Sequence, residues 1–447
     1  MMQAVDRRQM MQAIALAATG AGFGGGVAAG PAAAQLPLRR LAPLRHDAVQ
    51  SLIDAYVAKG AVPGAVVALV EPGRHKPVFV SAGVTAFGGS EKATPDTLWR
   101  LYSMTKPITA MAIMQRVATG ELRLDQPIAD IMPEFRDMKV LIDPEKGLES
   151  RSAARPITVR HLLTHTAGLS YSINGNGPLE REYKRMGIQP GSVPAFLQPG
   201  DGPLPDLQVM AAALAGLPLA LDPGTAWKYS VSLDLAGALL ERLTGMSFDK
   251  ALDQQILGPL GMKDTGFWAR DKSRLAANYL WTAPGTTKPL DKPIPISTME
   301  KDGFTAPPRL LSGGGGLVGS ARDYARFAQM VLNEGEFEGR IILPRGTARL
   351  ATSNLMPPGV FFDGQHGFGA GGRVTLFDTR QGAGLSRAGW AGSTADAYGW
   401  GGAAGTLFMA DSVRQFGIVL MLQTMGDSRL QRDADLAAAL ARDADGR

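Results

Sequence analysis

The chain has 447 residues, of which 45% are hydrophobic and 19% charged, and it contains no cysteine. This length and apolar content suffice for a large core in one or two domains. A formal net charge of +5 is too small and too scattered to indicate nucleic-acid binding. The lack of cysteine excludes a disulfide framework, a thiol nucleophile and a lipoprotein anchor.

The first 34 residues have the pattern of an export signal. Arg7 and Arg8 precede a weakly hydrophobic run rich in Ala and Gly, which ends in the small-residue cleavage pattern Ala32-Ala33-Ala34. Paired arginines before such a run resemble a bacterial twin-arginine signal. Glycines dilute the run, so no stable membrane anchor is expected. We predict a cleaved signal over residues 1–34 and a periplasmic or secreted protein, and the alternative is a disordered tail or short anchor.

After the signal, the pattern predicts a helix, two strands and a second helix. Helical spacing covers 47–59. Short apolar runs at 65–70 and 77–84 are joined through Pro72-Gly73, which is typical of a hairpin. A long apolar-periodic run then follows Ser103.

The middle of the chain has helical patterns separated by two irregular segments, and its end has strands. The expected helices are 156–165, 208–220, 230–244, 320–332 and 433–441, the irregular segments are 174–206 and 269–310, and the clearest late strands are 405–410 and 415–422. Strands at both ends predict one sheet built from the two termini and covered by helices. We expect one catalytic unit over 35–447, with an α/β lobe at about 45–110 and 335–447 and a helical lobe at about 111–334.

A Ser-x-x-Lys motif, Ser103 to Lys106, opens the second helix. A serine at the start of a helix lies near unpaired backbone N–H groups, and the positive end of the helix dipole favours an alkoxide-like oxygen. Three residues are about one turn, so the Lys106 amine returns to the Ser103 hydroxyl. Serine is a weak nucleophile until a neighbouring base or cation activates it, and this spacing supplies the neighbour.

The same motif recurs at Ser247 to Lys250, so context has to separate the two. Ser247 follows Gly245 and precedes another apolar-periodic run, which indicates one helix ending at Gly245 and a second capped by Ser247. Capping accounts for Ser247. Ser103 needs a catalytic explanation only if its partners exist elsewhere in the chain.

Two distant stretches offer such partners. Tyr229 stands where a loop enters a predicted helix; a free phenol has a pKa of about 10, but a nearby ammonium such as Lys106 favours the phenolate. The alternative for Tyr229 is a half-buried core tyrosine with its hydroxyl satisfied. The glycines between Tyr398 and Thr406 would let a substrate approach strand N–H groups that donate to an oxyanion, and the alternative is a tight turn entering an edge strand.

Together, these motifs resemble a known family. Ser103-Met104-Thr105-Lys106, Tyr229-Ser230 and Trp400-Gly401-Gly402 occur in the order and rough separation found in class C β-lactamase-like serine hydrolases, and the chain most resembles the family VIII carboxylesterases. Stretches 161–169, 259–265 and 313–318 resemble the same family, and the match covers roughly 45–425. The resemblance implies an α/β (α+β) fold of the β-lactamase or penicillin-recognising type, with an antiparallel sheet flanked by helices, a mostly helical lobe and the site between them.

The resemblance also implies roles for individual residues. Ser103 would be the nucleophile, Lys106 its activator and Tyr229 the general base and acid. The backbone N–H groups of Ser103 and Ala403 would form the oxyanion hole.

The residues expected to contact the substrate are Tyr102, Val231, Trp400, Gly401 and Gly402. Two of them depart from β-lactamases and penicillin-binding relatives, which usually have Tyr-x-Asn where Val231 stands, and Lys-Thr-Gly or His-x-Gly where Trp400 stands. Losing an amide donor and a cation weakens the binding of a β-lactam or a D-Ala-D-Ala end. An aromatic residue suits an apolar ester better, so these departures favour an esterase.

Three other patterns are interpreted as structural or absent. His161 and His165 share one predicted helix face, but no Glu follows His161 and no third metal ligand is evident. No Gly-x-Ser-x-Gly elbow is present, which disfavours an α/β-hydrolase. Gly313–Gly316 lacks a following Gly-Lys-Ser/Thr and is interpreted as a flexible lead-in to the next helix.

We therefore predict an exported serine hydrolase that cleaves a small-molecule carboxylic ester through an acyl-enzyme on Ser103 and needs no cofactor. A β-lactamase or D-Ala-D-Ala carboxypeptidase is the second hypothesis. A third is a non-turning-over binding module, a sensor that stays acylated, because Val231 would leave the deacylating water poorly positioned. Specificity is expected to lie in segments 174–206 and 269–310.

Overall fold

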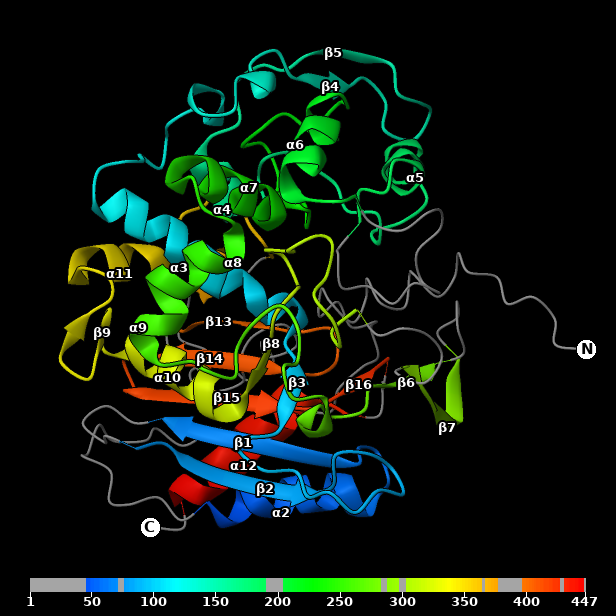
Figure 1. Ribbon diagram of the computed structural model, residues 1–447, viewed down its shortest axis with the longest axis vertical. Coiled ribbons are helices and arrows are strands. Elements are labelled where there is room, and N and C mark those ends of the chain that lie inside the picture. The colour runs from blue at the N-terminus through cyan, green and yellow to red at the C-terminus, as the bar shows by residue number, and fades with distance from the viewer. Residues whose placement is uncertain are drawn as a thin grey trace, which may run out of the picture.

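The computed structural model describes residues 46–70, 76–189, 204–282, 288–296, 303–363, 366–376, 396–426 and 430–445. The predicted signal over residues 1–34 and the predicted Pro72-Gly73 turn lie outside these ranges. A sheet with helices on both faces forms one part of the molecule, and further helices lie beyond it (Figure 1). In the described part, no helix has both the length and the apolar character of a membrane span.

A seven-stranded antiparallel sheet joins the two ends of the chain. In spatial order its strands are β11 (His366–Phe368), β12 (Arg373–Thr375), β13 (Tyr398–Gly401), β14 (Leu407–Asp411), β15 (Phe416–Met421), β1 (Gly64–Val70) and β2 (Val78–Gly83). In register, Val66 of β1 lies opposite Met421 on one side and Ser81 on the other. The predicted fold class, with a sheet built from both termini, is confirmed.

The α-helices of the described part vary from one turn to four. They are α2 (Asp47–Ala58), α3 (Thr105–Ala118), α4 (Val159–Leu163), α5 (Pro178–Arg185), α6 (Leu207–Ala215), α7 (Ser232–Thr244), α8 (Phe248–Leu252), α9 (Gly258–Leu260), α10 (Ala321–Leu332), α11 (Arg345–Thr352) and α12 (Arg432–Asp445). Smaller sheets pair β3 (Leu98–Arg100) with β8 (Val318–Ser320), β4 (Lys139–Leu141) with β5 (Ser150–Ser152), β9 (Glu336–Phe337) with β10 (Arg340–Ile341), and β6 (Tyr279–Thr282) with β7 (Pro289–Pro295) and β16 (Thr424–Met425).

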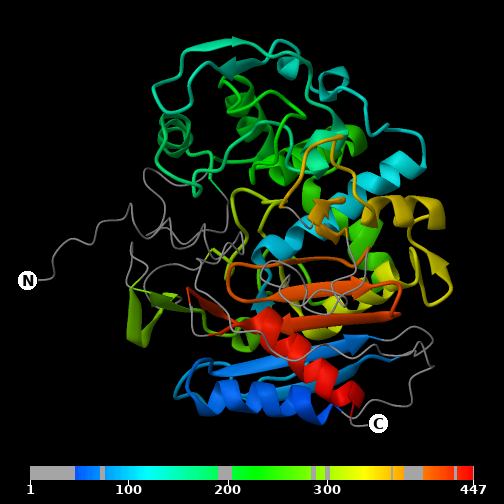
Figure 2. The same cartoon turned by 180° about the vertical axis from the view of Figure 1, so that it is seen from behind.

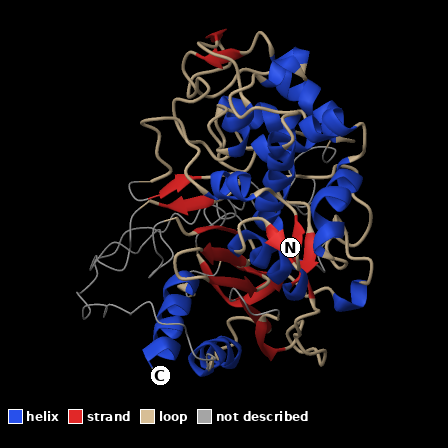
Figure 3. Cartoon of the chain, turned by 90° about the vertical axis from the view of Figure 1, so that its left-hand side faces the viewer, coloured by secondary structure: helices blue, strands red, loops and turns tan. Residues whose placement is uncertain are grey.

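Two hydrophobic cores lie on opposite faces of the main sheet. Because neighbouring side chains of a strand point to opposite faces, Val67 and Leu69 of β1 join the core under α2 and α12, whereas Val66 and Val70 join the core that contains α3 and α10. Helices α2 and α12 lie on the outer face of the sheet (Figure 2), and the strands lie between helices in the side view (Figure 3). The sheet is therefore buried on both faces, and α3 lies on its inner side.

Two segments predicted as irregular contain regular structure. Segment 174–206 includes α5, whose charged residues obscure the buried pair Leu179 and Tyr183, four residues apart. Segment 269–310 includes β6 and β7. The prolines of β7 hid it in the sequence, but β7 is an edge strand, where proline removes no ladder hydrogen bond.

Two predicted helices are shorter than expected. The helix expected over 208–220 ends at Ala215, and the one expected over 156–165 spans only Val159–Leu163. Gly245 ends α7 in the left-handed conformation, with φ of 66°, as predicted. Ser247 occupies the N-cap position of α8, but its side chain makes no capping hydrogen bond, so the prediction of a side-chain cap is wrong.

Asp323, in the first turn of α10, links that helix to residues 264–265, which lie after α9. Its carboxylate accepts hydrogen bonds from the Asp264 N–H at 2.7 Å and the Thr265 hydroxyl at 3.0 Å. Burial raises the pKa of Asp323 to about 6, and these two donors oppose the rise.

We expect Asp323→Asn to change how stability depends on pH. Because the pKa of Asp323 is higher in the folded chain than in the unfolded one, its stabilising contribution is complete below about pH 4 and is lost as the pH rises through about 6. The free energy of unfolding of the unaltered protein should therefore fall relative to the variant, on the order of 2 kcal/mol, between pH 4 and 7. Urea denaturation at several pH values checks this, and a constant difference would contradict it.

Candidate active site

Ser103 lies in a single 3-10 turn, η1 (Tyr102–Met104), between β3 and α3. The residue before it, Tyr102, has a φ of 46°, a left-handed conformation that is costly for a large side chain and is found mostly at turns and functional sites. Leu101 is fixed by a backbone hydrogen bond to the Leu317 carbonyl at 2.9 Å. Ser103 therefore lies at the start of a helix, as predicted, within a 3-10 turn that leads directly into α3.

Three predicted residues meet at one oxygen atom. Lys106 Nζ donates to Ser103 Oγ at 3.2 Å, and Tyr229 Oη donates to the same oxygen at 2.6 Å. The ammonium also lies over the Tyr229 ring, 4.5 Å from its centroid. All three side chains are buried, with Ser103 7% and Lys106 0% exposed. A phenol, an amine and a hydroxyl thus lie within proton-transfer distance in a site of low dielectric constant.

The Lys106 amine is held by the glycine-rich segment Gly313–Gly316. Nζ donates to the Gly314 carbonyl at 2.6 Å, and Thr109 of the same helix donates to the Gly313 carbonyl at 2.8 Å. Thr105 Oγ1 accepts from the Leu317 N–H at 3.1 Å. The interpretation of this segment as a flexible lead-in is therefore wrong, because it is buried and fastened along one face of α3.

Glycine is needed there because the segment passes between two helices. A Cβ at Gly313 would lie 2.4 Å from the Leu233 carbonyl oxygen, and one at Gly314 would lie 2.5 Å from Asp234 Oδ2. Both α7 residues come directly after the Tyr229 loop. The run of four glycines was the sequence signal for this close approach, since glycine lets two backbone segments meet without a side chain between them.

The predicted oxyanion element lies beside Ser103. Tyr398–Gly401 forms β13 itself, an interior strand between β12 and β14 rather than a lead-in to an edge strand. Gly402 and Ala403 form the turn after it, and a Cβ at Gly402 would lie 2.4 Å from the Leu101 carbonyl oxygen. Outside helices and strands, no backbone hydrogen bond from the Ala403 N–H is formed within the described part of the chain. The oxyanion role of the Ser103 and Ala403 N–H groups stays a prediction.

Gly402→Ala tests this close approach. The added methyl group would meet both the Leu101 carbonyl and Thr406 Oγ1, which lies 2.1 Å from its position, so the turn has to move. We expect the free energy of unfolding to fall by about 2 kcal/mol and kcat to fall by about tenfold or more. Urea denaturation and steady-state kinetics measure both. Gly147→Ala is the matched control, since nothing lies within 4 Å of its added Cβ, and an equal loss in both variants would contradict the interpretation.

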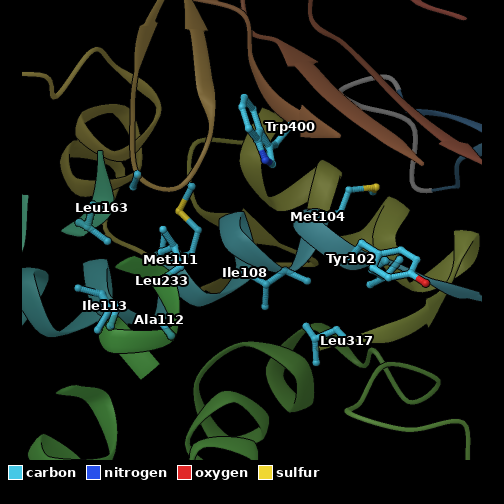
Figure 4. Close-up of a cluster of buried hydrophobic side chains, with 14 of the residues drawn as sticks. Tyr102, Met104, Ile108, Met111, Ala112, Ile113, Leu163, Leu233, Leu317 and Trp400 are labelled. Atoms are coloured by element: carbon cyan, nitrogen blue, oxygen red, sulfur yellow. The ribbon is translucent and has the colours of Figure 1, made fainter. Parts of the chain in front are cut away.

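Aromatic rings surround the Tyr229 side of the site. The Trp400 ring lies 5.9 Å from that of Tyr229 and 5.1 Å from that of Phe368, and Trp227 stacks on Tyr229 at 5.9 Å. Phe362 packs edge-on against Trp227 at 4.6 Å. Figure 4 shows Trp400 projecting from its strand above the helix that carries Ile108 and Met111. Among these rings, the sequence had assigned a substrate contact to Trp400 alone. Phe362 and Phe368 come from a segment with no motif, and Trp227, two residues before Tyr229, had been given no role.

The other residues expected to contact the substrate differ in exposure. Val231 is fully buried at the start of α7, where its N–H donates to the Ser170 carbonyl. The Tyr102 hydroxyl accepts from the Asn278 amide at 2.9 Å. Gly401 is partly exposed at the end of β13. The structure therefore places Val231 in the core beside Tyr229 rather than on an open surface.

The two histidines do not share a helix face, so that prediction is wrong. His161 belongs to the capping box of α4, whereas His165 follows the helix with a φ of 55°. His165 Nδ1 lies 3.1 Å from Ser230 Oγ, and its ring lies 4.8 Å from that of Tyr229. Burial and the Lys106 charge lower the pKa of His165 well below its usual value, so the ring is neutral near pH 7. In the described ranges, no three His, Asp or Glu residues gather into a possible metal site.

Comparison with known proteins places this geometry in a family. The Beta-lactamase family model matches residues 49–442. The chain belongs to the β-lactamase family. Esterase EstB of Burkholderia gladioli is 34% identical over 340 residues, covering 74% of this chain and 78% of its own. The predicted relation to β-lactamase-like esterases is thereby confirmed, and the chain is a serine hydrolase of this family.

Two solved structures have the same fold. EstCE1, described as a hydrolase with promiscuous acyltransferase activity, superposes with a TM-score of 0.70 at 26% identity, covering 88% of this chain and 98% of its own. Simvastatin synthase (LovD) of Aspergillus terreus superposes with a TM-score of 0.68 at 22% identity, covering 90% and 98%. The second likeness concerns the fold alone. Both superpositions cover most of this β-lactamase-family chain.

Proposed function

We propose that the protein is a carboxylesterase that forms an acyl-enzyme on Ser103. One observation carries the proposal: the Tyr229 phenol and the Lys106 amine both reach the Ser103 oxygen, at 2.6 and 3.2 Å, in a buried site. The relation to Esterase EstB supports an ester as the substrate. A hydroxyl held by two such groups matches an activated nucleophile with its base.

Acylation follows from these contacts. With Tyr229 as phenolate, stabilised by the Lys106 ammonium over its ring, the Ser103 proton passes to the phenolate while Oγ attacks the ester carbonyl carbon. The carbonyl oxygen becomes an oxyanion, which accepts hydrogen bonds from the N–H groups of Ser103 and Ala403. When the tetrahedral intermediate collapses, the bond to the alkoxy oxygen breaks and Tyr229 donates its proton to the leaving alcohol.

Deacylation reverses the proton path. Water gives a proton to the Tyr229 phenolate and attacks the acyl carbon, and the same N–H groups hold the second oxyanion. The bond to Ser103 Oγ then breaks, Oγ recovers the proton from Tyr229, and the carboxylic acid leaves.

The rings around Tyr229 favour an apolar ester over a β-lactam. Trp400 occupies the position where related enzymes have a cation, and its contacts are with Phe362, Phe368 and Tyr229. Position 231 provides a buried valine instead of an amide donor. A carboxylate or polar amide placed there would lose its hydration without gaining a charged partner, which is costly, whereas an alkyl or aryl acyl group would gain apolar contacts.

A substrate panel tests the proposal. Purified protein is compared on p-nitrophenyl acetate and butyrate, a chromogenic cephalosporin and a D-Ala-D-Ala peptide, with Ser103→Ala as the blank. We expect ester turnover to exceed turnover of both amide substrates. Faster turnover of the cephalosporin or the peptide would contradict the esterase proposal. One stable acyl group per chain with no product would instead identify a non-turning-over sensor.

A further inference from the structure

Asp234 is a fully buried acidic residue behind the Ser103–Lys106 pair. It lies in the first turn of α7, and its Oδ1 accepts from the Ser312 hydroxyl at 2.5 Å and from the Gly314 N–H at 3.1 Å. The Gly314 carbonyl oxygen in turn accepts a hydrogen bond from Lys106 Nζ at 2.6 Å. One residue, Gly314, therefore connects the carboxylate to the amine, through its N–H on one side and its carbonyl oxygen on the other.

Lys106 requires a compensating charge. Its side chain is 0% exposed, and none of the described residues forms an ion pair with it. A buried ammonium is costly unless nearby negative charge or acceptors compensate it. Asp234 interacts electrostatically with Lys106. Its second oxygen, Oδ2, makes no hydrogen bond with any described residue and lies 2.5 Å from where a Cβ on Gly314 would stand.

Building on the proposed esterase mechanism, we propose that Asp234 is a positioning residue for the catalytic lysine. Through Gly314 it directs the Lys106 amine toward Ser103 Oγ, and its negative charge balances the ammonium across the glycine segment. The side chains used in the proposed mechanism are those of Ser103, Lys106 and Tyr229, so this role adds a fourth side chain, which acts without touching the substrate.

The remaining titratable groups near this pair do not supply the charge. Tyr171 faces both Asp234 and Tyr229, and burial first, then those two groups, raise the pKa of Tyr171 well above its usual value, so its phenol is neutral. His165 is neutral for the reasons given above. Burial also raises the pKa of Asp234, while the Ser312 hydroxyl, the Lys106 charge and the Gly314 N–H favour its ionised form.

The test separates the charge of Asp234 from its hydrogen bonds. Asp234→Asn removes the charge and keeps an acceptor, Ser312→Ala removes a donor and keeps the charge, and Asp234→Glu keeps the charge but displaces it. The readout is the second-order rate constant for labelling by a fluorophosphonate between pH 5 and 10, which requires no ester substrate. Intact folding is verified by circular dichroism.

We expect the alkaline limb of the pH profile for Asp234→Asn to move to lower pH by about one unit, because the buried ammonium loses its counter-charge. Ser312→Ala and Asp234→Glu should be labelled more slowly, and the alkaline limb of their pH profiles should not shift. Superimposable profiles for Asp234→Asn and the unaltered protein, or an equal shift in Ser312→Ala, would overturn the charge role. If Asp234→Asn does not fold, an unchanged labelling rate in Asp234→Glu would overturn the positioning role. If the unaltered protein is not labelled, the proposed nucleophile is wrong, and this inference falls with it.

Discussion

Ser103→Ala is expected to lower kcat/KM for esters by about four orders of magnitude or more, because it removes the oxygen that takes up the acyl group. The fold should persist, since the lost atom is one hydroxyl oxygen and Lys106 keeps its bond to the Gly314 carbonyl. Leaving the Tyr229 hydroxyl without its acceptor should cost about 1–3 kcal/mol of unfolding free energy. Steady-state kinetics and urea denaturation measure the two effects.

The chain supplies a matched control for this variant. Ser247 opens the second Ser-x-x-Lys motif, and its side chain makes no capping hydrogen bond. Ser247→Ala should therefore leave kcat/KM unchanged and shift the unfolding free energy by less than about 0.5 kcal/mol. Ser103→Ala retaining more than a small share of the activity, or Ser247→Ala losing it, would contradict the assignment of the nucleophile.

Tyr229→Phe is expected to lower kcat by about 10²- to 10⁴-fold with little change in KM, because it removes only the oxygen that moves the proton. The ring keeps its stacking on Trp227 and its position under the Lys106 ammonium. Loss in kcat with an unchanged fold thus separates proton transfer from packing. The kinetics are measured on a p-nitrophenyl ester across the pH range.

Tyr171→Phe is the control for Tyr229→Phe. The Tyr171 ring is also buried, lies edge-on to Tyr229 at 5.6 Å and has the Lys106 amine 5.7 Å from its centroid, but its hydroxyl does not touch Ser103. We expect its kcat to fall by less than about tenfold. Equal losses in the two variants, or none in Tyr229→Phe, would show that the Tyr229 hydroxyl does not carry the proton.

The sequence predicted those parts of the molecule that local patterns specify. Apolar alternation and runs located β1, β14 and β15, and one helical turn of spacing placed Lys106 on Ser103. The pairing of both ends of the chain in one sheet followed from strands at both termini. The contact between Tyr229 and Ser103, 126 positions apart, was one of two open interpretations from the residues and was specified by the resemblance to a known family, because no local period encodes it.

What the sequence did not predict depends on tertiary packing. Gly313–Gly316 was interpreted as flexible because glycine has no side chain whose polarity indicates what packs against it. In the structure the segment packs between α3 and α7. Asp234 sits in an apolar helix pattern with nothing to mark its contact with Ser312. Helix α5 was hidden by its charges, and His165 left its helix because the chain turns there with a positive φ. Each of these features requires knowledge of what packs opposite.

Peptide mapping of the trapped acyl-enzyme tests the central claim most directly. Protein mixed with p-nitrophenyl butyrate and quenched in acid within milliseconds is digested with trypsin. Because Pro107 follows Lys106, cleavage is expected after Arg100 and Arg116, which gives one peptide, 101–116, with Ser103 as its single serine. We predict a butyryl group on Ser103 that appears before steady state and disappears when the ester is exhausted. Ester hydrolysis at full rate with peptide 101–116 unmodified throughout, or with the acyl group on another residue, would contradict it.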